Sequence, residues 1–234
     1  MKLLPTLQLC FFLVLGLALL TSCSESQEAS PAVVQENQND QSMANVGEIT
    51  INPFFEESPL YLNYPPFDRI ENSHYLPAFE RGMEEQLAQL SEIVNQASAP
   101  TFENTIIPLE LSGQLLSRVA TVFFSMSGAH TNEGIRELEQ KLAPQLAAHN
   151  DKILLNPALF ERINVLQEQR EELQLDAQSL RLLEQYHVDY MRAGAALTSQ
   201  QQDQMRETNR EIAVLRTQYR QNILSEVNDL AIVV

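Results

Sequence analysis

The chain has 234 residues, of which 44% are hydrophobic and 20% are charged, and its formal net charge is −16. A surface this acidic repels phosphate backbones, which argues against nucleic acid as a partner. Glycine is scarce at 7 residues and tryptophan is absent, while Leu, Gln, Glu and Ala dominate, a composition that favours helices over sheets. We therefore expect an all-α protein.

Residues 1–22 have the features of an export signal. Lys2 gives a short basic start, and the apolar run of residues 9–20 is too short for a comfortable membrane span. Residues 20–23, LTSC, resemble the site at which bacterial lipoprotein precursors are cleaved before a cysteine that is then acylated. The sequence favours a lipoprotein signal peptide with lipidation at Cys23 over an ordinary secretory signal in which this cysteine has no role.

Residues 23–50 are predicted to be a disordered tether between a lipid anchor and the folded part. The segment is rich in Gln, Asn, Glu and Ser and has too few large apolar residues to order itself. As a flexible coil its ends would lie about 30 Å apart. Because Ser24 rather than an acid follows Cys23, we expect residence at the outer membrane of a Gram-negative envelope, facing the periplasm.

Residues 51–234 are predicted to form one helical domain. It opens with residues 51–72, where prolines disfavour helix and several aromatic side chains need a packing surface. We expect this segment to lie as a strap across the helices. The alternative is a proline- and aromatic-rich recognition motif.

Apolar residues at steps of three and four predict a first helix over residues 74–96. Asn72 or Ser73 can cap its start, and Pro77 is tolerated in a first turn. The helix is expected to end before Pro100.

The segment 101–131 predicts one long helix around which the domain is organised. Its apolar residues form two adjacent stripes, which are Ile106, Leu109, Gly113, Leu116, Ala120 and Phe123, and Ile107, Leu111, Leu115, Val119, Val122 and Met126. Such a helix must be packed on several sides, which is typical of the inner wall of a larger body. Pro108 should bend it or mark its first turn, and Gly128 is a plausible C-cap.

Further helices are expected downstream, over residues 132–150, 156–173, 176–194 and 198–228. Pro144 should kink the first of them, and Asn156 before a proline is a strong helix start. Asp176 and Thr198 are the expected caps of the last two. The final helix is predicted to turn these residues inward: Met205, Ile212, Leu215, Tyr219 and Ile223.

The sequence ends in an apolar, β-prone run, residues 230–234. An uncovered run of this kind is an aggregation liability. We therefore expect either that the chain is the front part of a longer protein or that a second chain covers its end.

The chain lacks the common signatures of catalysis. Its four histidines, His74, His130, His149 and His187, do not form an HExxH motif, and no Gly-rich phosphate loop or G-x-S-x-G elbow occurs. Two Glu-x-x-His pairs do occur, Glu71 with His74 and Glu184 with His187, a spacing that binds two irons in ferritin-like bundles. Surface or edge histidines are the preferred interpretation, so we assign no catalytic or metal-binding residue to this chain.

Three segments together resemble a known family: residues 52–83, residues 100–132, and residues 179–197 with the helix containing 211–224. In order and spacing they are similar to the N-terminal region of the thimet-oligopeptidase-type zinc metallopeptidases. The resemblance is greatest to the bacterial peptidyl-dipeptidase (dipeptidyl carboxypeptidase) and oligopeptidase A branch. It covers about residues 52–234.

The resemblance implies a clamshell-shaped, almost wholly helical enzyme in which short peptides enter a deep channel. Zinc lies at the channel floor, held by an HExxH helix and a downstream glutamate. These catalytic parts have no counterpart in the 234 residues, so no catalytic residue of the family matches a position here. The resemblance therefore implies the channel wall of a peptidase, most simply one that releases C-terminal dipeptides, with zinc bound elsewhere and no activity in this chain alone.

A different class of function stays open, namely a non-enzymatic periplasmic lipoprotein that binds peptides or serves as a scaffold. Such a protein would have kept the peptide-facing wall and lost the enzyme. It predicts a cooperatively folding, monodisperse chain, whereas a piece of an enzyme predicts exposed apolar surface. Specificity for dipeptide release over internal cleavage also stays open.

Overall fold

The structure, a computed structural model, describes residues 51–229. The predicted signal peptide, the tether, Cys23 and residues 230–234 lie outside the described residues. Every regular element within 51–229 is a helix, which confirms the all-α prediction. No helix in this range is long and apolar enough to cross a membrane.

The elements follow the order expected from the sequence. A short 3-10 turn (Tyr61–Asn63) comes first and a π-helical turn (Phe102–Ile106) precedes the second helix. The helices are α1 (Asn72–Val94), α2 (Ile107–Glu110), α3 (Gln114–Ala129), α4 (Glu133–Leu154), α5 (Pro157–Glu168), α6 (Ala177–Ala193) and α7 (Ser199–Asp229).

Predicted helix starts are confirmed where a side chain can accept from the first turn. The Asn156 side chain accepts from the backbone N–H of Ala158, and that of Asp176 from Gln178. At α6 the predicted end is also correct, because Gly194 closes the helix with φ +102°. The predicted fourth helix ends earlier than expected, at Glu168.

Other predicted ends were wrong. α1 begins at Asn72 and its N-cap is Glu71, so Pro77 lies inside the helix and not in its first turn. α3 is capped at His130, and Gly128 is an ordinary helical residue. α4 continues through Pro144, and the kink expected there stays a prediction.

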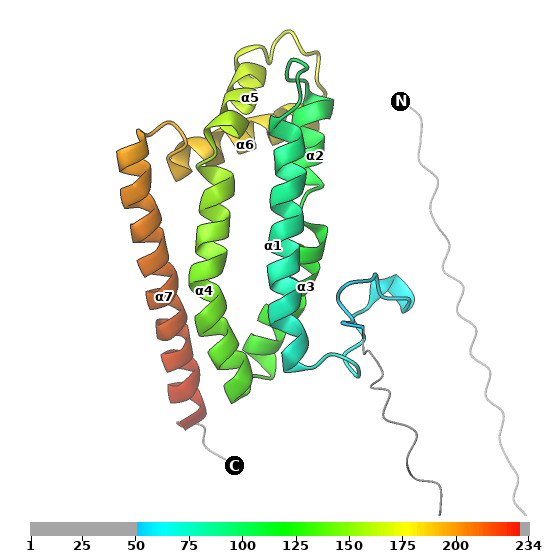
Figure 1. Cartoon of the computed structure of the whole chain (residues 1–234), viewed down its shortest axis with the longest axis vertical. Helices are drawn as coiled ribbons and strands as arrows, with labels where there is room; N and C mark the ends of the chain where they lie inside the picture. Colours follow the sequence, from blue (N-terminus) through cyan, green and yellow to red (C-terminus); the bar gives the residue numbers. More distant parts are fainter. Residues whose placement is uncertain (1–50, 230–234) are drawn as a thin grey trace, which may run out of the picture. The chain divides into compact units, whose positions relative to one another are not determined.

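The long helices pack along one another, as Figure 1 shows. α1 lies between α3 and α4, and α7 packs against the other side of α4. α5 and α6 pack together at the upper end of this view, where α5 also contacts α1. The helix α1 therefore contacts α2, α3, α4 and α5.

The segment 101–131 is not one continuous helix as predicted, because it is broken between α2 and α3. α2 ends at Glu110, and α3 begins after Gly113, whose φ of +73° is left-handed. The Gly113 N–H donates to Gln89 Oε1 at 2.9 Å. A side chain at Gly113 would also collide with the amide of Gln86, at 2.5 Å, so α1 fixes the position of the break.

The break divides the apolar stripes between two buried clusters. Residues before it, such as Ile106 and Leu109, pack with α5 and α6, whereas Leu115, Val119 and Phe123 pack with α1 and α4. Two residues of the predicted stripes are exposed instead, namely Ile107 at 40% and Leu111 at 60%. The apolar surface is thus narrower than a continuous helix would give.

The proline-rich strap is anchored near its beginning and again at Ile70, close to its end. Phe54 is buried and its ring lies 5.4 Å from that of Tyr75, and Arg81 lies over the ring of Phe55. Tyr61 and Leu62 are by contrast 87% and 83% exposed. The predicted packing across the helices is therefore confirmed for the first residues and is wrong for the middle of the segment.

α7 differs from the prediction in the face that it turns inward. Its buried side chains are the polar Gln202 and Thr217, and Met205 is only half-buried. The other residues predicted inward are exposed: Ile212, Leu215, Tyr219 and Ile223. Within residues 51–229, no α7 side chain belongs to either buried apolar cluster.

Gly82 lies where α1 closely approaches α3, and alanine there is expected to destabilise the fold. A Cβ at Gly82 would lie 2.9 Å from the Leu116 backbone, and overpacking of this kind costs about 1–3 kcal/mol. Gly128→Ala is the matched control, because a Cβ there meets nothing within 4 Å and alanine favours helix by up to about 1 kcal/mol. Urea unfolding followed by circular dichroism checks both. A Gly82→Ala protein as stable as wild type would contradict the close packing.

Candidate functional site

The first Glu-x-x-His pair is a helix cap. The Glu71 N–H donates to His74 Nδ1 at 3.0 Å, and the His74 N–H donates to the Glu71 carbonyl. The His74 carbonyl in turn accepts from Asn52 Nδ2 at 2.8 Å. Because Nδ1 already accepts a hydrogen bond, this nitrogen is not free to bind a metal.

The second pair is part of the packing between α5 and α6. His187 Nε2 lies 3.2 Å from Asn164 Oδ1, and the His187 ring stacks on Phe160 at 5.9 Å. Glu184 forms a surface ion pair with Arg181 at 3.7 Å. In the part of the chain that the structure describes, no group of three or more His, Cys, Asp or Glu side chains is placed to hold a metal ion. The di-metal interpretation therefore has no support there.

A cluster of tyrosines lies where α6 meets α2. The Tyr186 hydroxyl donates to Glu110, and desolvation together with this hydrogen bond raises the pKa of Tyr186. Burial also raises the pKa of Tyr190, whose hydroxyl has no hydrogen-bond partner in the structure. Both phenols stay protonated at neutral pH, so they can donate a hydrogen bond but do not supply a base or a nucleophile.

His149 links α4 to the break between α2 and α3. Its Nε2 lies 2.7 Å from Gln86 Oε1, and Gln86 Nε2 donates to the Ser112 hydroxyl. His149 is buried, and it lines a surface hollow between α1 and α4 with Glu80, Glu84 and Lys152. Burial, and secondarily the charge of Lys152, lowers the pKa of His149. The neutral ring is therefore the form that fits the fold.

This shift predicts a loss of stability in mild acid. Because the His149 pKa is lower in the folded state than its unfolded value of about 6.5, the unfolded chain binds more protons below that pH. The free energy of unfolding should fall as the pH is lowered from about 7 to about 5, before Asp176, whose pKa is also lowered, contributes at more acidic pH. Urea unfolding of His149→Gln should show a weaker dependence in this range, and the exposed His130→Gln is the control. Equal pH dependence in both variants would contradict this role.

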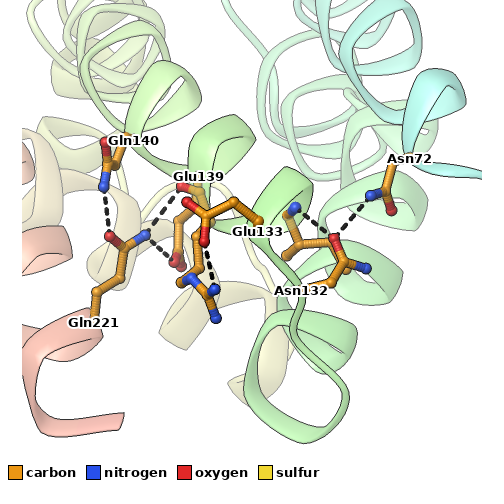
Figure 2. A network of polar contacts seen from close by, with 8 residues as sticks. Asn72, Asn132, Glu133, Glu139, Gln140 and Gln221 are labelled. Atoms are coloured by element: carbon orange, nitrogen blue, oxygen red, sulfur yellow. Dashed lines mark hydrogen bonds and ion pairs between the residues drawn. The ribbon is translucent and has the colours of Figure 1, made fainter. Parts of the chain in front are cut away.

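A buried carboxylate network joins α3, α4 and α7. Glu139 is 2% exposed and forms an ion pair with Arg220. It also accepts from the Ser127 hydroxyl at 3.1 Å and from Gln221 Nε2 at 3.0 Å. Figure 2 shows Glu139 and Gln221 pointing toward one another, with Gln140 donating to the Gln221 side-chain oxygen.

Sequence reasoning missed this network, although a signal was available. Glu139 is four residues after Ile135 and three before Leu142, so it falls on the apolar face of the predicted helix. A charged residue in that position needs a buried partner. Its partner Arg220 is 81 residues away, and only the tertiary structure brings the two together.

The hydroxyl and carboxylate of this network serve the packing of the helices. Ser127 is a hydroxyl beside a carboxylate, but it is 2% exposed and Glu139 is already ion-paired, so no substrate reaches it. The described residues likewise offer no ligand set that fits zinc. What this part of the chain supplies is a shaped helical body with apolar surface on it.

Curated relatives are similar to most of this chain. The dipeptidyl carboxypeptidase of Salmonella typhimurium is 41% identical over 177 residues, which are 76% of this chain and 26% of that protein. The dipeptidyl carboxypeptidase of Escherichia coli is 40% identical over 189 residues, 78% of this chain and 28% of that protein. The oligopeptidase A of Escherichia coli is 21% identical over 160 residues, 68% of this chain and 24% of that protein. No protein-family model matches the chain.

These similarities confirm the predicted family resemblance. The higher identity favours the dipeptidyl carboxypeptidase branch over the oligopeptidase A branch. The chain spans about a quarter of the length of the curated relatives that it matches.

Proposed function

We propose that this chain is a helical wall of a zinc peptidase that releases C-terminal dipeptides from short peptides. In its matched region the chain belongs to the dipeptidyl carboxypeptidase branch of the thimet-oligopeptidase-type family. The observation that carries the proposal is 41% identity over 177 residues to an enzyme of that name. The all-helical architecture of residues 51–229 supports it. Dipeptide release is favoured over internal cleavage because the oligopeptidase A relatives are half as similar.

Zinc in this proposal is held by a part of the enzyme that the chain does not contain. The sequence has no HExxH motif, and the described residues offer no group that fits a metal. When bound in such an enzyme, zinc activates water and polarises the scissile carbonyl. The residues of this chain would shape and narrow the path by which a peptide reaches that centre, and we expect the purified chain alone to hydrolyse nothing.

A chimera tests the proposal. Residues 51–229 replace the matched region of the Salmonella typhimurium dipeptidyl carboxypeptidase, and dipeptide release from a short peptide is measured by mass spectrometry. The folded chimera is expected to release dipeptides, and a zinc chelator should abolish the reaction. The unmodified 234-residue chain is the control and should be inactive. A chimera that folds but releases no dipeptide, or a chain that cleaves peptides alone, would contradict the assignment.

We also propose that lipid on Cys23 anchors the protein to a membrane, with the outer membrane of a Gram-negative cell as its site. The support is the LTSC sequence at residues 20–23. Replacing Cys23 by alanine is expected to move the protein from the membrane fraction to the soluble fraction and to abolish incorporation of labelled fatty acid. Ser24→Ala is the neighbouring control. Unchanged membrane association of the Cys23→Ala protein would argue for an ordinary signal peptide or another anchor.

A further inference from the structure

The helix α7 is attached to the rest of the described part by polar groups. Asn209 Nδ2 donates to Asp151 Oδ1 at 2.7 Å, and Gln221 Nε2 donates to the Arg136 carbonyl at 3.1 Å. The ion pair between Arg220 and Glu139 lies on the same side of the helix. α7 is therefore held on α4 by hydrogen bonds and an ion pair, beside half-buried apolar residues such as Val214 and Leu224.

An adjacent, exposed side of α7 carries an apolar stripe, which we define as Ile212, Leu215, Tyr219, Ile223 and Val227. These residues recur at steps of three and four, so they lie along one side of the helix. They are 39%, 54%, 69%, 43% and 61% exposed. A surface helix normally turns such a face toward the core, whereas α7 turns it away from the helices of the described part.

The apolar stripe is long enough to pack along another helix. It runs over residues 212–227, which corresponds to about 22 Å at 1.5 Å per residue. Contiguous exposed apolar residues of this extent mark a site of contact with another polypeptide or a membrane. A membrane-surface helix would be rich in Lys and Arg on its polar face, but α7 also carries Asp203, Glu207, Glu211 and Glu226, which anionic lipid repels.

We propose that the apolar stripe of α7 packs against the part of the family's polypeptide that lies outside the region matched by this chain. The inference rests on the proposed function. About three quarters of each dipeptidyl carboxypeptidase relative lies outside that region, and a polypeptide of that size needs a seam with the matched helices. α7 is held on α4 by its polar contacts and leaves the apolar stripe exposed for this contact.

The test compares α7 in the 234-residue chain and in the chimera described above. A cysteine replaces Tyr219 in the stripe or, as control, the exposed Gln218 beside it. Reaction with a maleimide is followed by mass spectrometry of the peptide that contains the new cysteine. Reaction at position 219 is expected to be at least tenfold slower in the chimera than in the chain, and reaction at position 218 is expected to be similar in both.

A second measurement does not depend on labelling. Leu215→Glu is expected to leave the Tm of the chain within a degree or two, because Leu215 is already 54% exposed. In the chimera the same substitution should lower the Tm clearly. Equal effects in both proteins would overturn the proposal, as would a chimera that fails to fold, since the proposal requires α7 to fit the seam.

Other outcomes point to other occupants and also overturn the proposal. Protection of position 219 that rises with concentration of the chain itself indicates a second copy, and protection by anionic phospholipid vesicles indicates a membrane. The test of the α7 contact can fail without the peptidase assignment failing, and the reverse also holds. Dipeptide release with position 219 reactive refutes the seam alone, and a protected position 219 in a folded, inactive chimera refutes the peptidase assignment alone.

Discussion

Replacing Phe123 by alanine is expected to lower the free energy of unfolding by about 3–5 kcal/mol, because the large aromatic side chain leaves a cavity that its neighbours fill only in part. Phe123 is fully buried. Its ring lies 5.1 Å from that of Tyr75 and 5.4 Å from that of Phe79, both in edge-on geometry. These contacts join α3 to α1 at the centre of one apolar cluster, so both burial and aromatic pairing are lost together.

Phe124→Ala is the matched control for this prediction. The residue is adjacent, of the same type and in the same helix, but it is 38% exposed. Its removal should cost clearly less, because less apolar area returns to water. Urea unfolding of both variants, followed by helical circular dichroism, gives the comparison. Phe124 also pairs with Phe123 and Phe79, so equal losses would contradict the larger contribution expected from the fully buried ring of Phe123.

Arg220→Ala is the second large effect, and we expect a loss of about 3 kcal/mol. The substitution leaves the Glu139 carboxylate buried with only neutral donors, and an uncompensated buried charge costs about 3–5 kcal/mol. The lower end of this range applies because the Arg220 side chain is 45% exposed, whereas that of Glu139 is 3% exposed. Since the pair joins α4 to α7, hydrogen exchange of the α7 backbone amides should accelerate most.

Two further variants separate the effect of breaking the ion pair from the effect of removing an arginine. Arg216→Ala removes an exposed arginine of the same helix for which the described part of the chain shows no ion pair, and it should be nearly neutral. Adding Glu139→Gln to Arg220→Ala should recover much of the loss, because the buried charge is then gone. If Arg220→Ala costs no more than Arg216→Ala, or if Glu139→Gln restores nothing, the ion pair does not hold α7 in place.

Local signals in the sequence were enough for most of the helix order. Asn156 followed by proline, Asp176, and Gly194 each act within one helical turn, so their effect does not depend on distant residues. The family resemblance was also readable, since it depends on the order of quoted segments and not on their packing.

The sequence also shows directly that the chain has no HExxH motif, because this motif is a local pattern of five residues. For this reason we assigned no catalytic residue. For the two Glu-x-x-His pairs the sequence left the outcome open. The structure resolves them by contacts: His74 caps α1 through Glu71, and His187 packs between Phe160 and Asn164. A spacing of three residues shows that the glutamate and histidine side chains can meet on a helix. It does not show which other groups hydrogen-bond to the ring nitrogens of the histidine.

Tertiary structure decided the features that depend on distant partners. The segment 101–131 predicts one continuous helix, yet Gln86 and Gln89 of α1 hydrogen-bond Ser112 and Gly113 at a break. The apolar residues of α7 predict an inward face, yet Glu139 and Asp151 of α4 bind Arg220 and Asn209 on another side of the helix. Sequence periodicity shows that a helix has an apolar and a polar side. Which side turns inward depends on the charged and amide groups of the helices that pack against it.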